Sequence, residues 1–263
     1  MFYNKTNGFN TYNGWHKERT IFLLKDNETL EDLGLDGLKL IQSDQFFKFG
    51  TDAVLLADFA KVKPTGCAID LCTGSGIVPL LLSARFPLLT IEALELSEDM
   101  ADMARRSVAI SGRSEQIHIT CGDVLNVREL YRGRQFDLVC CNPPYQKKGS
   151  GRINPNAAKA AARHELFCTL EDVVSAAAYL TKPCGTFAMV HRPERLTDIL
   201  HIMRTQGLEP KRLILVADRP KKAPDLVLVE GRRGGRAQLT VETLYIEEKK
   251  HGWNTVSLRD THR

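Results

Sequence analysis

The sequence lacks any run of apolar residues near the roughly 18 that a helix needs to cross a bilayer, which excludes a protein that spans a membrane in this way. It also lacks an apolar stretch at its start, because Met1–Gly8 is mostly polar, so we expect no secretory signal. Acidic and basic residues nearly balance, and the net charge of +4 identifies no partner by itself. The 263 residues suffice for one large domain or two small ones.

The cysteines are odd in number, seven, and include no Cys-x-x-Cys pair, so neither a disulfide framework nor a metal site is indicated. Cys67, Cys140 and Cys141 lie in or beside apolar runs, where cysteine usually acts as a small buried side chain. The seven histidines are scattered without the spacing of metal ligands. We therefore expect reduced thiols, a cytoplasmic protein and no bound metal.

From Cys67 onward, short apolar runs alternate with longer helical patterns. This alternation predicts an α/β fold with a doubly wound, mostly parallel sheet. Two late strands follow each other without a helix between them, which predicts an antiparallel C-terminal edge. The predicted strands are 67–71, 90–95, 117–120, 136–141, 185–190, 213–217 and 226–230, and the predicted helices are 51–60, 77–84, 98–110, 170–180 and 193–206.

The segment before this alternation is less regular. Two short strands, 21–24 and 38–41, are expected to pair across a turn over 30–37, and Thr51 or Asp52 is expected to cap the helix that follows. We expect an N-terminal region over residues 1–63 with a tail, short strands and one helix, a main domain over 64–250, and a C-terminal tail over 251–263.

A glycine-rich turn, Asp70–Gly76, joins the first main strand to its helix. Its glycines let a ligand approach the backbone, and the helix start offers free N–H groups. Glu95, at the end of the second main strand, can accept both hydroxyls of a ribose, and Asp123, after the third, can accept a hydrogen bond from an adenine amino group. Pro79 replaces the third glycine of a dinucleotide-binding motif, which disfavours a nicotinamide-dependent dehydrogenase.

Asn142-Pro143-Pro144-Tyr145 directly follows the fourth main strand. Ligands of open α/β sheets bind beyond the carboxyl ends of the strands, so Gly74 and Asn142 are expected to face one pocket. The prolines restrict the turn and can fix the Pro143 carbonyl beside the amide oxygen of Asn142. Two fixed neutral acceptors suit a planar amino group that gains positive charge as it attacks an electrophilic methyl. Tyr145 can stack on a planar substrate, and its face can favour a sulfonium cation.

Together these motifs resemble those of the class I S-adenosylmethionine-dependent methyltransferases that methylate exocyclic amino or amide nitrogens. Within that class, the chain is similar to the bacterial tRNA (adenine-N6) methyltransferases that modify the adenine beside the anticodon of a valine tRNA. The closer similarity rests on the segment Phe47–Leu56, on the compact sheet and on Ala162-Arg163-His164-Glu165. It covers about residues 38–230.

The resemblance implies a Rossmann-like fold, S-adenosylmethionine as cofactor, and a role for each motif. Asn142, Pro143, Pro144 and Tyr145 would form the catalytic turn. The cofactor's methionine part would lie on Asp70 and the turn that follows, its ribose on Glu95, and its adenine on Asp123 and Val124. Thr51 and Asp52 would close the methionine end. The full set of implied cofactor contacts is Thr51, Asp52, Asp70, Cys72, Gly74, Gly76, Glu95, Leu96, Asp123, Val124 and Asn142, in which Cys72 departs from the small or apolar residues usual at its position.

The Asn-Pro-Pro-Tyr turn is shared by adenine-N6, guanine-N2 and protein glutamine-N5 methylation, so it cannot choose between them. Glutamine methyltransferases usually carry an N-terminal helical domain, whereas the residues before Cys67 are mostly tail and short strands. DNA adenine methyltransferases need a target-recognition domain, for which the fewer than 40 residues after Glu230 leave little room. We expect adenine-N6 methylation of tRNA. Guanine-N2 methylation of ribosomal RNA, glutamine-N5 methylation and a non-catalytic RNA-binding module of the same fold are the alternatives.

Basic residues gather in two segments, Lys147–Arg163, which has no acidic residue before Glu165, and Lys211–Arg236, which has eight basic residues against three acidic ones. Such clusters can pair with phosphates, or can form a solvated surface. We expect a tRNA partner and no membrane contact, and the oligomeric state stays open between monomer and homodimer. The residues expected to contact RNA are Lys147, Lys148, Arg152, Arg163, Arg219, Lys221 and Lys222.

Overall fold

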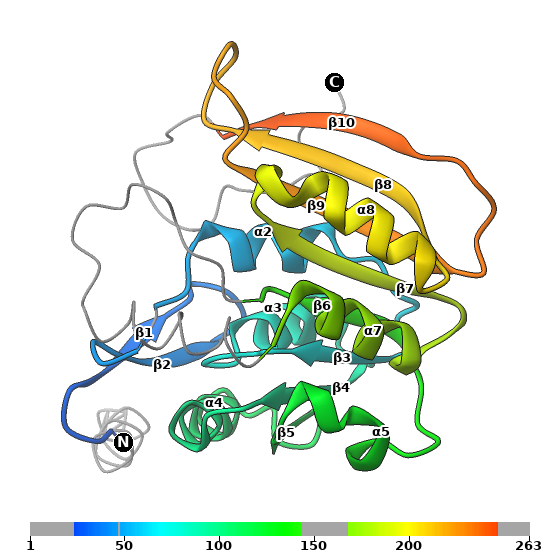
Figure 1. Ribbon diagram of the computed structural model, residues 1–263. Helices are drawn as coiled ribbons and strands as arrows, with labels where there is room; N and C mark the ends of the chain where they lie inside the picture. The colour runs from blue at the N-terminus through cyan, green and yellow to red at the C-terminus, as the bar shows by residue number, and fades with distance from the viewer. Residues whose placement is uncertain (1–23, 47, 144–167, 247–263) are drawn as a thin grey trace, which may run out of the picture.

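An eight-stranded sheet runs through the protein (Figure 1). The computed structural model describes residues 24–46, 48–143 and 168–246. The strand order is β10-β8-β9-β7-β6-β3-β4-β5, and every pairing is parallel except those of β9, which is antiparallel to β7 and β8. The strands are β3 (Cys67–Leu71), β4 (Thr90–Glu95), β5 (Ile117–Cys121), β6 (Phe136–Cys141), β7 (Thr181–His191), β8 (Leu208–Ala217), β9 (Leu226–Arg233) and β10 (Thr240–Tyr245).

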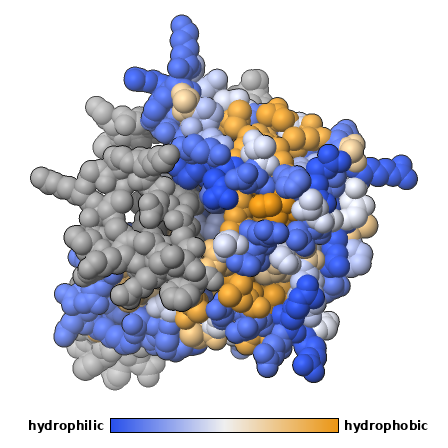
Figure 2. Space-filling model, in the orientation of Figure 1, coloured by the Kyte–Doolittle hydropathy of each residue, from blue (hydrophilic) through white to orange (hydrophobic). Residues whose placement is uncertain are grey.

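Helices cover both faces of the sheet, because its central strands are apolar on both sides. One apolar cluster joins the sheet to α2 (Thr51–Phe59), α3 (Ile77–Arg85) and α4 (Glu98–Ile110). The other joins it to η1 (Val124–Asn126), α5 (Val127–Leu130), α7 (Leu170–Leu180) and α8 (Leu196–Thr205), which η2 (Pro193–Arg195) precedes. Over α7 and α8, apolar surface shows between hydrophilic side chains (Figure 2), as expected of amphipathic helices. No helix in the described ranges is long and apolar enough to span a membrane.

A small antiparallel hairpin, β1 (Glu28–Asp32) and β2 (Lys39–Ser43), precedes the sheet and packs on α4. Arg106 of α4 forms a bidentate ion pair with Glu28, with both N···O distances 2.6 Å. The sequence placed the first strand at 21–24 and a turn over 30–37. The turn prediction is wrong in its first part, because β1 occupies 28–32 and the reversal takes place over 33–38, where Gly34, Asp36 and Gly37 have positive φ. Residues 21–23 lie outside the described ranges.

In the main domain most predicted elements are confirmed, and β4, α4, β6 and α7 have the predicted bounds. β7, β8 and β9 are longer than predicted, and β10 was not predicted. The antiparallel pairing expected near the C-terminal end is present in β9, but β10 adds one more strand beside β8, parallel to it. The division of the chain at residues 63 and 250 stays a prediction.

Two arginines hold the carboxyl end of α2 against its neighbours. Arg85 of α3 donates to the carbonyls of Ala57, Asp58 and Ala60 at 2.6–2.8 Å. Arg212 of β8 lies over the ring of Phe59 and donates to its carbonyl. At the other end, the N-cap is Gly50, without a side-chain capping bond, so the predicted capping by Thr51 or Asp52 is wrong. In the first turn, Asp52 instead accepts the N–H of Ala53 on its Oδ1 at 3.0 Å.

We predict that Arg85→Ala lowers the free energy of unfolding by about 1–3 kcal/mol, because three carbonyls lose the cation that they share. The measurement is urea unfolding followed by circular dichroism. Arg195→Ala, which removes an exposed pair with Asp198, is the matched control and should change the stability by less than about 0.5 kcal/mol. Equal midpoints for Arg85→Ala and the unaltered protein would contradict the anchoring role.

Candidate active site

Four neighbouring parallel strands, in the spatial order β6-β3-β4-β5, end at one edge of the sheet, and each is followed by residues singled out in the sequence. Asn142 follows β6, the glycine-rich turn follows β3, Glu95 ends β4, and Asp123 follows β5. The sheet thus brings together at its carboxyl edge residues that lie up to 72 positions apart (142 − 70). This is where ligands of open α/β sheets bind.

The glycine-rich turn has a backbone that only some residues adopt easily. Gly74 and Gly76 have φ of 60° and 85°, and Gly76 is the N-cap of α3. A Cβ atom at Gly76 would lie 3.1 Å from the Cβ of Ala104, so α4 packs closely on the turn. Cys72 also has a positive φ, 57°, in the left-handed region that favours glycine. The turn is therefore strained at Cys72, which the sequence analysis did not foresee.

Glu95 ties two loops together. Its side chain is buried, with one oxygen accepting the backbone N–H of Gly74 at 2.8 Å and the other accepting that of Ser97 at 2.9 Å. Each carboxylate oxygen keeps a further lone pair for a ligand hydroxyl. The Glu95 carbonyl accepts the N–H of Gly122, which joins the ends of β4 and β5.

Asp70 is the most buried carboxylate at this edge, with 1% of the residue exposed. Within the described ranges its Oδ1 has no hydrogen-bond partner of standard geometry, and the Thr73 hydroxyl is near enough to interact favourably with the carboxylate. Burial raises the pKa of Asp70 to about 7; the Thr73 side chain opposes the rise, and the charge of Glu95 adds to it. A buried carboxyl oxygen without a partner attracts a cationic ligand, because a positive charge would stabilise its ionised form.

The remaining predicted cofactor contacts border the same edge. Asp123 caps η1 by accepting the N–H of Leu125 at 2.9 Å, and Val124 is buried beside it. Leu96 is 39% exposed, so its side chain is available to a ligand. The positions of these residues agree with an adenine site, and their individual roles stay predictions.

The catalytic turn begins beside the glycine-rich turn. Leu71 of β3 pairs with Cys141 of β6, so Asn142 follows directly at the level of Cys72. Asn142 is half-buried and Pro143 is buried. Pro144 and Tyr145 lie outside the described residues, as do Lys147, Lys148, Arg152 and Arg163.

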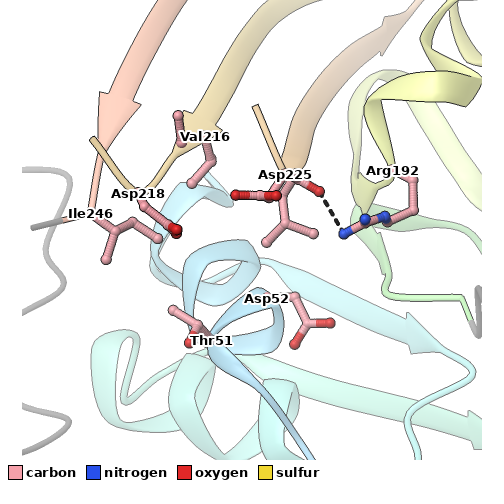
Figure 3. A pocket seen from close by; sticks show the side chains of 9 residues that line it. Thr51, Asp52, Arg192, Val216, Asp218, Asp225 and Ile246 are labelled. Atoms are coloured by element: carbon pink, nitrogen blue, oxygen red, sulfur yellow. Dashed lines mark hydrogen bonds between the residues drawn. The ribbon is translucent and has the colours of Figure 1, made fainter. Parts of the chain in front are cut away.

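Thr51 and Asp52, at the start of α2, line a cavity whose other walls come from the ends of β8 and β9 and from Arg192 (Figure 3). Asp52 is buried there, with 3% of the residue exposed. The lining includes no residue of the glycine-rich turn. Contact of Thr51 and Asp52 with the methionine end of a cofactor stays a prediction.

The basic residues of the segment Lys211–Arg236 lie at opposite edges of the sheet, because β8 and β9 run in opposite directions. Arg219, Lys221 and Lys222 lie in the turn after β8, at the edge that carries Asn142, and all three are exposed. Lys222 forms ion pairs with Asp218 and Asp225. The other five, Lys211, Arg212, Arg232, Arg233 and Arg236, lie at or near the opposite edge, where Arg212 and Arg233 bind backbone carbonyls. The segment is therefore not one basic cluster, and only the three predicted contact residues lie near the site.

His191 ends β7, and Arg192, the next residue, lines the cavity; neither was expected from the sequence to belong to the site. Burial lowers the pKa of His191 to about 4, and its Nδ1 accepts the N–H of Arg192 at 2.8 Å. A signal was present, because these residues directly follow a predicted strand. In the described part of the chain, no group of three or more His, Cys, Asp and Glu side chains is placed to hold a metal ion.

The fold and this edge define a class I S-adenosylmethionine-dependent methyltransferase. Residues 41–193 match the family model of the methyltransferase small domain. A tRNA1(Val) (adenine(37)-N6)-methyltransferase of Porphyromonas gingivalis is 34% identical over 191 residues, which cover 70% of this chain and 74% of that protein. A relative of the same name from Aeromonas salmonicida is 33% identical over 188 residues, 71% of this chain and 77% of its own. The chain belongs to the tRNA1(Val) (adenine(37)-N6)-methyltransferase family.

Solved structures agree on the fold. A predicted O-methyltransferase of Agrobacterium tumefaciens superposes with a TM-score of 0.59 and 24% identity, covering 76% of this chain and 90% of that one. A class I S-adenosylmethionine-dependent methyltransferase of Listeria monocytogenes superposes with a TM-score of 0.52 and 10% identity, covering 74% and 62%. These likenesses concern the fold and not the acceptor atom. The family, the fold class and the cofactor expected from the sequence are confirmed.

The residues present fit S-adenosylmethionine, which supplies an electrophilic methyl group on a sulfonium sulfur. The unpartnered Oδ1 of Asp70 suits the ammonium group of its methionine part. The free lone pairs of Glu95 suit ribose hydroxyls, and the backbone of Gly74 and Gly76 leaves room for close approach.

We predict that cofactor affinity in the unaltered protein weakens by up to about tenfold for each pH unit below 7, because the ammonium group binds the ionised form of Asp70. Isothermal titration with S-adenosylmethionine between about pH 5.5 and 7.5 measures this dependence. Asp70→Asn should bind more weakly and with little dependence on pH. An equally steep pH dependence in Asp70→Asn would contradict the assignment.

The same pKa has a consequence for stability without cofactor. Because the folded pKa lies above the ordinary value of 3.8, the stabilising contribution of protonated Asp70 is present below about pH 4 and is lost as the pH rises through 7. Relative to Asp70→Asn, the cofactor-free protein should therefore become less stable over that range. Thermal unfolding of both proteins across the same pH range measures this difference in stability.

We predict that Cys72→Gly is more stable than Cys72→Ala by about 0.5–1 kcal/mol, because glycine adopts the positive φ without a Cβ penalty. Both substitutions remove the thiol, so their difference isolates the backbone strain. Urea unfolding measures it, and the opposite order of stability would show that the turn is not strained at Cys72.

Proposed function

We propose that the protein transfers a methyl group from S-adenosylmethionine to N6 of an adenine in tRNA, next to the anticodon of a valine tRNA. The observation that carries this proposal is the similarity to the Porphyromonas gingivalis enzyme over 74% of its length. In this chain Asn142 and Pro143 follow β6 at the carboxyl edge of the sheet, which also carries the predicted cofactor contacts and is called the cofactor edge below. Membership of a methyltransferase family sets aside the non-catalytic alternative.

The chain's own residues act by holding an amino group in place. The side-chain oxygen of Asn142 and the carbonyl of Pro143 are neutral acceptors at the end of a buried strand, and proline restricts the backbone between them. The exocyclic nitrogen of adenine is planar and must become pyramidal and positively charged as it attacks. Acceptors that are already in place stabilise that charge without reorganising. Tyr145 would stack on the base that is removed from its neighbours.

Guanine-N2 and glutamine-N5 methylation are less well supported. The described residues before β3 form a hairpin and one helix rather than a helical domain of the kind expected for glutamine methyltransferases. The relatives from Porphyromonas gingivalis and Aeromonas salmonicida carry adenine N6 in their names. We also propose that tRNA phosphates are contacted by seven basic residues, Lys147, Lys148, Arg152, Arg163, Arg219, Lys221 and Lys222. A tRNA substrate supports the further proposal that the protein acts in the cytoplasm.

The experiment incubates the purified protein with S-adenosylmethionine and a transcript of valine tRNA, and then digests the RNA for nucleoside mass spectrometry. We expect N6-methyladenosine at the position next to the anticodon. Methylguanosine, or methyl transfer to a release factor in place of RNA, would replace this function by one of the two alternatives.

Asn142→Ala should lower the rate of transfer by about 100-fold or more, because one of two fixed acceptors is lost. Cofactor affinity, measured by isothermal titration, should change little. Gln206→Ala, which removes an amide at the end of α8 near the opposite edge of the sheet, is the control and should keep full activity. Equal losses of transfer and cofactor binding in Asn142→Ala would contradict the assigned role.

A further inference from the structure

A cavity of about 280 Å³ opens at the carboxyl edge of the sheet, on the side of β6 away from the cofactor residues (Figure 3). It lies between the start of α2 and the ends of β7, β8, β9 and β10. Neither Asn142 nor Pro143 lines it, and neither does Glu95 or any residue of the glycine-rich turn. The cavity thus lies at the same edge of the sheet as Asp70, Glu95 and Asn142 but is not lined by them, although it includes Thr51 and Asp52 of the predicted methionine end.

Hydrogen bonds to backbone carbonyls hold the rim of the cavity. The N–H of Asp225 donates to the carbonyl of Val216 at 2.8 Å, and the N–H of Ile246 donates to that of Ala217 at 2.9 Å. Arg192 donates from Nη1 to the Asp225 carbonyl at 2.8 Å, as the dashed line in Figure 3 shows. The walls are therefore preformed and do not depend on a ligand for their position.

The lining combines apolar walls with acceptors. Val216, Leu226 and Ile246 offer apolar surface, while the carboxylates of Asp52, Asp218 and Asp225 stand around it. Lys222 pairs with Oδ2 of Asp218 and with Oδ2 of Asp225, which leaves Oδ1 of each carboxylate to accept an N–H group of a flat ring. The planar guanidinium of Arg192 can stack on such a ring. Apolar walls, a guanidinium that can stack and carboxylate oxygens that can accept N–H groups together favour a nucleobase.

The distance to the catalytic turn excludes the methylated base itself. Met189 of β7 pairs with Cys141 of β6, so Arg192 lies one strand over from Asn142 and slightly farther along. Asp225 and Asp218 follow from β9 and β8, the next two strands. With strands about 4.8 Å apart, the cavity centre is on the order of 10 Å from Asn142. A base in the cavity therefore belongs to a neighbouring nucleotide.

We propose that this cavity binds an unstacked base of the RNA substrate, from a nucleotide flanking the methylated adenine, with its N–H groups on Asp218 and Asp225. The proposal rests on the proposed function and adds a second recognised base to it. Adenine is methylated at Asn142 while its neighbour is held two to three strands away, so the loop must be splayed open between them. The enzyme would then recognise its RNA by this neighbouring base as well as by the adenine, so an adenine in an arbitrary flexible loop would not be enough.

The test is a double-mutant cycle between protein and RNA. Anticodon stem-loops of valine tRNA are made with the target adenine intact and with an abasic site at the nucleotide on one side or the other. Methylation rates at limiting RNA are compared for the unaltered protein and for the variant Asp218→Asn with Asp225→Asn. Asp198→Asn, an exposed carboxylate of α8 outside the cavity, is the matched control.

In the unaltered protein and in Asp198→Asn, one abasic site should lower kcat/KM by about tenfold, as expected for loss of one stacked and hydrogen-bonded base. In the double variant the intact RNA should be correspondingly slower, and the same abasic site should have little further effect. If the abasic site and the double substitution lowered kcat/KM independently, so that their effects multiplied at both flanking positions, the proposal would be overturned. A weaker affinity of the double variant for S-adenosylmethionine would also overturn it, because the cavity would then serve the cofactor.

The two proposals fail in different ways. If the intact stem-loop yields N6-methyladenosine and the cycle shows no coupling, only the base-binding cavity is wrong. If no adenine is methylated in any RNA by the unaltered protein, the proposed function is wrong and the cavity assignment falls with it.

Discussion

The carboxylate of Glu95 is the contact on which the cofactor edge depends. One oxygen binds the N–H of Gly74 and the other that of Ser97, so a single side chain fixes the starts of two βα connections relative to each other. The close contact between Gly76 and Ala104 holds the same two connections from the other side. Because this carboxylate is buried, both hydrogen bonds form away from water and hold the loops firmly. The edge is therefore shaped before any ligand arrives.

Asp70 gives the same edge an unfavourable group that a ligand can stabilise. Its partnerless oxygen lies close enough to Glu95 for the two negative charges to interact, and burial keeps its pKa near 7. Replacing it by a neutral residue would favour folding, whereas keeping it favours a cationic ligand. Strain at Cys72 follows the same pattern, since a left-handed backbone in the binding turn is tolerated only because the surrounding contacts fix it. Stability is thus lowered where binding occurs.

Elements set by their own sequence were predictable, and those set by distant partners were not. β4, α4, β6 and α7 have clear apolar periods between turn or capping residues, and their bounds were predicted to the residue. β10 has only Leu244 buried and exists because β8 offers it an edge, so its own pattern was too polar to reveal it. The order of the site residues followed from the motifs. The separation of Arg219 from Arg232 follows from the antiparallel pairing of β8 and β9, which the two predicted strands already implied.

That reversed strand also explains how the edge acquires a second half. In a purely parallel sheet, each strand end is followed by a connection to a helix, as at Gly74 and Ser97. Because β9 runs the other way, its first residue, Leu226, reaches the same edge as the end of β8, and the connection over residues 218–225 closes one side of the cavity. The cofactor half is built from βα turns and the other half from a hairpin and the start of α2. Changes in the hairpin can therefore alter the recognised base without disturbing Glu95 or Asp70.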